Sequence, residues 1–519
     1  MNARLLHPDR DFELPRHGPG DAPAVIQDLA LDTLVDAMAG DDAFLAGVVR
    51  AALLAGLRND RETILYRQAA LRDALRKPQV VRGLYAFVVD TIEQKRRHSF
   101  GLFSRYPSAI LHGAIDLLQV LTGRLCALRD TAREQAERFE SEAFTNLFAM
   151  LDRELSDEYL ARVRTHLRDL RFRDGVLLSA ALGLGNRPTH YVLLQPADRK
   201  GPWWARWLGR DGPAYSFQLA ERDEAGARAL ADMQGRGINA VANALGQAAD
   251  HVVAFFEALR VELAFYVAAL NLQDRLAALG LPVAWPRPAP AGTLTFRAQG
   301  LYDVSLALQA GRPVVGNAVN ADGRRLVIVT GPNQGGKSCF LRSVGLAQLM
   351  MRAGLFVGAE TFEAELCTGL FTHYKREEDA TMTSGKLDEE LARISDLADR
   401  IEPGSWLLLN ESFASTHERE GSEIARQVVS AFLEHGVRIF FVTHLYEFAR
   451  SWFEAGRPDT LFLRAERRAD GARTFRMVEG EPLGTSHGRD LYRRIFASRP
   501  AATAPASHPG FGPAGSGPS

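Results

Sequence analysis

The residues best suited to chemistry lie in the segment GPNQGGKS, residues 331–338. The segment fits the pattern GxxxxGK[ST], follows the apolar run VIVT and precedes an amphipathic stretch, so a strand is expected before it and a helix after it. Glycines let successive backbone N–H groups turn toward one anion, and a helix N-terminus adds to the same field. A glycine-rich turn without a ligand is the alternative, but it requires strand, helix and lysine to coincide by chance. The pattern therefore predicts a triphosphate site made by Gly331, Pro332, Asn333, Gln334, Gly335, Gly336, Lys337 and Ser338.

Polar residues follow two further apolar runs that read as buried strands. WLLLNES places Asn410 and Glu411 after one run, and FFVTHL places His444 after another. Lys337 is expected to contact the β- and γ-phosphates, and Ser338 and Asn410 are expected to hold Mg²⁺. Glu411 is the candidate base that orients water, with His444 near the γ-phosphate. A lone histidine at a strand end is often structural, but its register with the other two strand ends favours the site.

Asn410 stands where such sites usually carry an aspartate. An amide keeps the hydrogen bonding but loses the negative charge. One unit charge about 4 Å from a dication matters by a few kcal/mol even at an effective dielectric near 20. The sequence therefore predicts weakened magnesium affinity or hydrolysis.

Alternating elements surround these residues in the second half of the chain. Apolar runs at residues 326–330, 405–410, 437–443 and 459–464 are separated by helical segments, which predicts buried strands in an α/β layer fold. The first half reads as helices, and two long apolar stripes, at residues 144–170 and 238–270, predict two rods that pack antiparallel. Ordinary bundle helices are the alternative to projecting arms. We expect a helical core at 1–125, lever-like helices at 126–290, an ATPase-type head at 291–498 and a disordered tail at 499–519.

Between the two stripes, a loop predicted at about residues 185–220 carries an unusual mixture of aromatic and basic residues. Three of the six tryptophans of the chain fall within PWWARW. Such a mixture suits phosphate contact with base stacking, whereas the alternative is a hairpin that packs its own tryptophans. The candidate DNA contacts are Arg199, Lys200, Trp203, Trp204, Arg206 and Arg210.

Composition sets limits on the class of protein. The 519 residues have 62 Lys and Arg against 63 Asp and Glu, so no overall basic field indicates a nucleic-acid or membrane partner, and any such contact must be local. The three cysteines are far apart and form no CxxC pair, which argues against a disulfide framework or a structural zinc site. No apolar leader or uninterrupted membrane span is recognised, so a soluble cytoplasmic protein without a membrane partner is expected.

Five stretches resemble the ATPase domain of the MutS family, an ABC-type branch associated with DNA mismatch repair. They are TGPNQGGKS, the segment GLFVGAETF through SGKLDEEL, LLLNESFASTHEREGSEIA, FFVTHLYEF and PLGTSHGRDLYRRI; upstream, ILYRQAALRDAL is similar to the start of the family's helical core. The resemblance implies ATP and Mg²⁺ as ligands and a homodimer through the ATPase domains. It also implies that Ser384 and Gly385 of the signature segment face the partner's γ-phosphate.

The sequence also departs from the family pattern. The stretch before the predicted core is too short for the family's mismatch-recognition and connector domains, and no Phe-x-Glu wedge is found near the start. The D-loop reads FAST where the family has GRGT. We therefore expect an ATP-gated, DNA-binding MutS-related ATPase. A nucleotide-gated protein scaffold with slow or no hydrolysis is the alternative, and a P-loop small-molecule kinase fits the long rods poorly.

Overall fold

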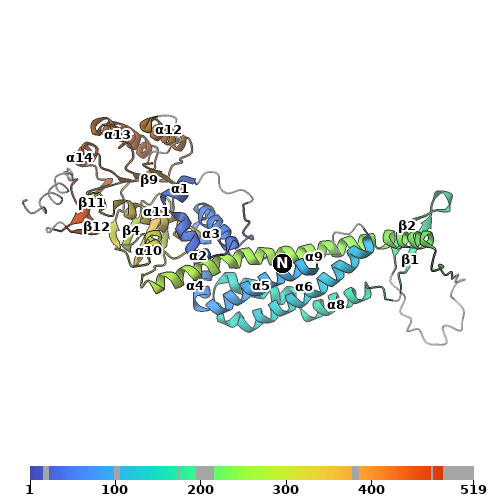
Figure 1. Ribbon diagram of the computed structural model, residues 1–519. Helices are drawn as coiled ribbons and strands as arrows, with labels where there is room; N and C mark the ends of the chain where they lie inside the picture. Colours follow the sequence, from blue (N-terminus) through green and yellow to red (C-terminus); the bar gives the residue numbers. More distant parts are fainter. Residues whose placement is uncertain are drawn as a thin grey trace, which may run out of the picture.

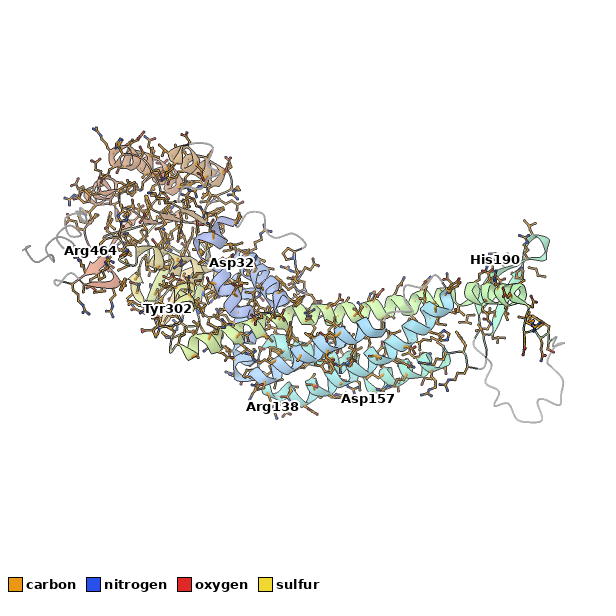
Figure 2. The ribbon with its side chains drawn as sticks, viewed as in Figure 1. Asp32, Arg138, Asp157, His190, Tyr302 and Arg464 are labelled. Carbon is orange, nitrogen blue, oxygen red and sulfur yellow. The ribbon has the colours of Figure 1, made fainter. Side chains whose placement is uncertain are left out.

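The computed structural model describes residues 1–15, 23–98, 106–173, 175–194, 216–376, 385–468 and 472–482. Figure 1 shows an α/β head from which a bundle of helices extends, with a two-stranded hairpin at the far end of the bundle. In Figure 2, Tyr302 lies in the head, Asp157 in the bundle and His190 in the hairpin. Residues 1–15 and 23–60 lie against the head and the adjoining end of the bundle.

The apolar runs predicted as strands form the main sheet of the head. Its order is β12-β11-β6-β10-β9-β8, and all neighbouring strands are parallel except the pair β11 and β12. The bounds are β6 (Leu326–Thr330), β8 (Leu370–Tyr374), β9 (Trp406–Asn410), β10 (Arg438–Val442), β11 (Thr460–Arg467) and β12 (Arg473–Glu479). Parallel strands that are covered on both faces are apolar along their length, which is why four of these strands were predictable.

Helices cover both faces of this sheet. They are α10 (Val304–Ala310), α11 (Lys337–Ala353), α12 (Lys386–Ala398), α13 (Glu418–Glu434) and α14 (Tyr446–Glu454). Alternate residues of one strand enter different cores: Leu407 and Leu409 pack with α12, α13 and α14, whereas Leu408 packs on the α11 side. The head is therefore a layered α/β structure, as predicted.

A second, smaller sheet is joined to the first by a buried ion pair. Its order is β3-β7-β4-β5, with β3 (Arg287–Ala289), β4 (Phe296–Leu301), β5 (Asn317–Asn320) and β7 (Thr361–Glu365). Arg438 at the start of β10 is 2.9 Å from Glu365 at the end of β7, and both side chains are at most 5% exposed. The guanidinium also donates to the carbonyls of Thr295 and Ala321 at 3.0 and 2.6 Å, so both charges are compensated where water is excluded.

The N-terminal helices share a core with the head. These are α1 (Pro23–Asp28), α2 (Leu31–Ala39) and α3 (Ala43–Ala55). Close approach requires glycine at two contacts: a Cβ on Gly345 of α11 would lie 2.8 Å from Leu29, and one on Gly56 would lie 3.0 Å from the backbone of Ala353. One apolar cluster therefore runs without interruption from the N-terminal residues into the head.

A buried glutamate attaches the first residues of the chain to the longest helix, α9 (Glu224–Ala278). The Glu262 carboxylate accepts backbone N–H bonds from Leu5, from Leu6 at 3.0 Å and from Phe12 at 2.7 Å. Burial raises the pKa of this carboxyl group to about 7, while the three N–H donors act in the opposite direction.

The bundle consists of α4 (Arg61–Arg76), α5 (Pro78–His98), α6 (Pro107–Gln135), α7 (Glu142–Glu154), α8 (Asp157–Asp169) and α9. The long rod predicted around residues 238–270 is confirmed as part of α9. The helix begins earlier than predicted, and its first turns gave no sequence signal because they are exposed and carry no apolar stripe. In Figure 1, α5 leads away from the head, and α6 and α9 both return toward it. Helix α9 packs mainly on α6, which runs in the same direction, and on α5, which runs opposite to it. The predicted antiparallel pairing of the rod at 238–270 with the rod at 144–170 is therefore not the main contact of α9.

The other predicted rod, at residues 144–170, is wrong as a continuous helix. It is divided into α7 and α8 at Leu155 and Ser156, and both helices pack on α6. Ser156 caps the second helix by accepting the backbone N–H of Tyr159 at 3.3 Å, and Asp157 and Glu158 follow in the first turn. The apolar stripe keeps its phase across the break and conceals this helix start.

The hairpin at the far end is formed by β1 (Leu178–Leu182) and β2 (Pro188–Leu193), which pair antiparallel. A hairpin was predicted in this region, but residues 195–215 lie outside the described chain.

In the described part, the helical segment from Pro107 to Arg138 is long and apolar enough to cross a membrane by length and composition alone. It is 44% buried in its most apolar window, and buried bundle helices meet the same criterion.

Candidate functional site

The segment after β6 forms a tight loop that only glycine can make. Gly331 has φ +120° and Gly336 has φ +91°, which L side chains rarely adopt. A Cβ on Gly335 would lie 2.8 Å from the Cβ of Ala465 and 2.9 Å from the Pro332 carbonyl. Gly336 is the N-cap residue of α11, so the loop ends at the positive end of that helix.

Lys337 folds back over this loop. Its Nζ donates to the carbonyls of Gly331 and Pro332, both at 3.0 Å, and lies 3.4 Å from Nε2 of His444. The residue is 4% exposed. Burial lowers the pKa of its amine to about 8, and the Glu411 carboxylate opposes that shift. The amine is thus held at the centre of the loop, and its pKa lies closer to neutral pH than that of an exposed lysine.

Glu411 and His444 meet at the adjoining strand ends. Strands β9 and β10 are parallel with Asn410 opposite Val442, and the Glu411 N–H donates to the Val442 carbonyl at 2.8 Å. This register brings Glu411 Oε1 within 2.9 Å of His444 Nε2. That hydrogen bond lowers the pKa of Glu411 most, with smaller contributions from the charges on His444, Lys337 and Lys375, and burial opposes them. The carboxylate is therefore an ionised acceptor at neutral pH.

Ser338 and Asn410 form a second pair beside the lysine. The Ser338 hydroxyl donates to Asn410 Oδ1 at 3.0 Å. Both residues contribute neutral oxygen atoms, and oxygen is the ligand type that Mg²⁺ takes. Ser338 lies in the first turn of α11 and Asn410 at the end of β9, the two elements that usually supply the magnesium ligands beside such loops. The donor set fits this ion, but it carries no negative charge of its own.

The hairpin of β11 and β12 supplies contacts that the motif did not predict. Arg473 donates to Oε1 of Gln334 at 2.6 Å, and Phe475, with φ +59°, places its carbonyl 3.3 Å from where a Cβ on Gly336 would lie. No sequence signal marks these residues, because their position depends on the pairing of β12. Lys375 was also missed; its N–H donates to the Asn410 carbonyl at 3.0 Å, and the rarity of lysine in this chain was the available signal.

Of the predicted residues not yet placed, Gly385 and Asn333 lie within the described part of the chain. Gly385 is the N-cap residue of α12, and among the described residues no hydrogen bond or ion pair joins it to residues 331–338. Ser384 lies outside the described residues. So do Arg199, Lys200, Trp203, Trp204, Arg206 and Arg210. Asn333 is exposed and makes no hydrogen bond within the described chain.

Comparison with known families matches both halves of the chain. The family model described as MutS2 N-terminal domain matches residues 59–279, and the one described as MutS domain V matches residues 327–497. The chain belongs to the MutS family. This confirms the resemblance inferred from the sequence motifs, and the MutS domain V match covers all the site residues described above.

Individual MutS-family relatives match over part of their length. The DNA mismatch repair protein MutS of Chloroflexus aurantiacus is 32% identical over 193 residues, which are 36% of this chain and 20% of that protein. The corresponding protein of Thermus aquaticus is 29% identical over 235 residues, 45% of this chain and 28% of that protein. Endonuclease MutS2 of Lactiplantibacillus plantarum is 28% identical over 187 residues, 36% of this chain and 23% of that protein. The chain thus spans about a fifth to just over a quarter of these relatives.

Proposed function

We propose that this MutS-family protein binds ATP with Mg²⁺, hydrolyses it, and uses the cycle to open and close a homodimer that acts on DNA. The observation that carries the proposal is the convergence of Lys337, the first residue of α11, with Glu411 and His444, which follow the neighbouring parallel strands β9 and β10. A glycine-rich loop that served only as a turn would not need a buried amine facing an ionised carboxylate. The glycines let the loop pack closely against Ala465, and the positive φ of Gly331 and Gly336 allows backbone N–H groups to turn toward one anion.

Binding of the triphosphate is assigned to residues 331–338. The N–H groups of the loop and the start of α11 face the phosphate oxygens, and Lys337 exchanges its two carbonyl acceptors for phosphate oxygens. Ser338 and Asn410 hold Mg²⁺, which neutralises phosphate charge when it is bound. Because Asn410 is neutral, the metal is expected to bind more weakly than it would to an aspartate.

Hydrolysis is assigned to Glu411 and His444. The Glu411 carboxylate accepts a hydrogen bond from the attacking water and orients it toward the γ-phosphate. Since the pKa of Glu411 is lowered by the bond to His444, orientation of the water is expected to exceed proton removal as its contribution. His444 fixes the carboxylate and touches Lys337, so it can register whether a γ-phosphate is present.

Dimerisation would complete each site with residues of a second copy. Ser384 and Gly385, at and before the start of α12, are proposed to meet the γ-phosphate bound by the other subunit. Closure on ATP and opening on hydrolysis would move the helical bundle, which includes the lever-like helices predicted at 126–290, together with its tip relative to the bundle of the second copy. The tip residues Arg199, Lys200, Trp203, Trp204, Arg206 and Arg210 are proposed to contact DNA, and the cytoplasm is the proposed compartment.

The scaffold with slow or no hydrolysis is the second candidate, and the uncharged pair of Ser338 and Asn410 favours it. One set of assays separates the two. ATP binding is measured with a fluorescent nucleotide, and phosphate release is measured without DNA and with duplex, branched and mismatched DNA. Glu411→Gln is expected to bind ATP and lose most of its turnover, while Glu434→Gln, an exposed glutamate of α13, serves as the matched control.

Each result has a defined meaning. Failure to bind adenine nucleotide refutes the proposed function. If the protein binds ATP but its turnover is no higher than that of Glu411→Gln, the scaffold function is established. Combined replacement of Trp203, Trp204, Arg206 and Arg210 should lower DNA affinity and reduce its salt dependence, and an unchanged affinity and slope would remove the tip from the proposal.

A further inference from the structure

A cavity of about 620 Å³ lies between α6 and α8, away from the nucleotide loop. Figure 1 shows these two helices in the bundle, where the C-terminal part of α8 points toward the end that carries the β1–β2 hairpin. The cavity is lined mainly by polar and charged side chains: Gln119, Thr122, Gly123, Arg164, Leu167, Arg168, Arg171 and Arg173. Nothing in the proposed ATPase cycle uses it.

Helical spacing places the arginines together. Arg164 and Arg168 are four residues apart and so lie on one side of α8, and Arg171, which follows the C-cap residue Leu170, lines the same cavity. Leu167 on the same side is buried against α6 and anchors the helix there. The apolar contact thus fixes the arginines on the side that faces α6.

These arginines differ from the others on the same helices in having few acidic partners. Arg171 is held by Asp116 and by Gln119 Oε1 at 2.9 Å. Within the described chain, Arg164, Arg168 and Arg173 form no ion pair and no side-chain hydrogen bond. Elsewhere on these helices the arginines face carboxylates: Arg124 with Asp90, Arg129 with Asp157, Arg133 with Asp152 and Arg162 with Glu158. The uncompensated positive charge is therefore concentrated at the cavity.

Gly123 keeps the cavity open on the α6 side. A Cβ built on this residue meets no atom within 4 Å, so its position faces free space. Glycine inside a helix is unfavourable relative to alanine by backbone entropy, and no close contact explains its presence here. A residue with a side chain at this position would project into the space beside the arginines.

We propose that this cavity is a binding site for a small anion with several phosphate groups, of the chemical kind of triphosphate. Guanidinium groups offer paired N–H donors that match phosphate oxygens, and the volume is within the range of small-ligand sites. A nucleic-acid backbone would follow an extended run of positive charge, but the arginines farther along α6 are neutralised by Asp90, Asp152 and Asp157. The concentration of charge in one hollow favours the compact ligand.

The test uses inorganic triphosphate and the full chain carrying Lys337→Ala, so that the loop at 331–338 contributes little. Calorimetric titration should show saturable binding, which the double variant Arg164→Gln/Arg168→Gln weakens at least about tenfold. Gly123→Glu should weaken it similarly by filling the hollow with an opposite charge. Arg162→Gln, which removes a paired arginine of the same helix, should leave the affinity unchanged, and thermal unfolding verifies that all variants fold.

Three results would overturn the proposal. The first is the absence of saturable triphosphate binding. The second is binding that the double arginine variant and Gly123→Glu both leave intact. The third is duplex DNA binding that requires Arg164 and Arg168 while triphosphate does not bind, which would make this surface a nucleic-acid contact. Because Lys337→Ala is present throughout, none of these outcomes depends on the proposed ATPase cycle.

Discussion

Replacement of Glu262 by glutamine should detach the first residues of the chain from α9. The two oxygens of the Glu262 carboxyl group, both able to accept even when the group is protonated, face three backbone N–H groups, those of Leu5, Leu6 and Phe12. An amide has one acceptor oxygen, so in either orientation its NH₂ group must face at least one of these donors. The lost hydrogen bond and the buried, unpaired N–H together cost about 1–3 kcal/mol. At pH 5, Glu262→Gln should therefore lower the free energy of unfolding by about 1–3 kcal/mol.

The same variant should change the dependence of stability on pH. The pKa of Glu262 rises from its ordinary value of 4.5 to about 7 in the folded protein, chiefly through burial. Between these values the folded state holds a proton that the unfolded state has lost, so the free energy of unfolding falls as the pH rises. The decrease is at most about 1.4 kcal/mol per pH unit. A glutamine does not titrate, so the advantage of the wild type over the variant should shrink from pH 5 to pH 7.

Urea denaturation at several pH values measures this advantage, and hydrogen exchange locates it. The amides of residues 5, 6 and 12 should exchange faster in the variant. Glu257→Gln is the matched control, since Glu257 lies on the same helix but is exposed, and its ion pair with Lys95 is long, at 3.5 Å. It should change the free energy of unfolding by no more than about 0.5 kcal/mol. If the advantage of Glu262 instead grows as the pH rises, the carboxylate is ionised and stabilising in the fold, and the reasoning is refuted.

Other expected outcomes concern the site and the joint between the sheets. Asn410→Asp should restore a charge beside Ser338 and lower the Mg²⁺ concentration for half-maximal ATP binding by at least about tenfold; an unchanged value would show that Asn410 does not approach the metal. Nucleotide affinity should fall as the pH rises above about 8, where the amine of Lys337 loses its proton, and a flat profile between pH 7 and 9.5 would contradict this. Glu365→Ala should destabilise the head by about 3–5 kcal/mol in thermal or urea unfolding, because it leaves Arg438 buried and unpaired; a loss below about 1 kcal/mol would mean that water reaches the guanidinium.

The sequence was most informative where one local rule controls the structure. Uniformly apolar runs predicted β6, β9, β10 and β11, because strands buried on both faces have few alternatives. It was least informative where two signals compete. At Ser156, the apolar stripe predicted continuity while the cap and the acidic residues after it ended one helix and began another. The packing of α2 and α3 on the head was not predictable either, since an apolar face does not specify its partner.

The candidate site divides in the same way. Residues 331–338 were predictable as a phosphate loop because glycine, lysine and serine at this spacing act locally. Glu411 and His444 needed only the assumption that parallel strands end at one edge of the sheet, and the distance of 2.9 Å between them agrees with it. Arg473 and Phe475 depended on how β12 pairs with β11, which no short pattern specifies.

The distribution of glycine along α9 has a mechanical consequence. At about 1.5 Å per residue the helix is about 82 Å long, and its glycines, at positions 226, 235, 237 and 246, all lie in the half away from the head. The half nearer the head has none and contributes most of the buried side chains of the helix. Each glycine weakens a helix by about 1 kcal/mol relative to alanine. The half of α9 that carries the hairpin should thus unfold locally at a lower free-energy cost than the half packed at the head.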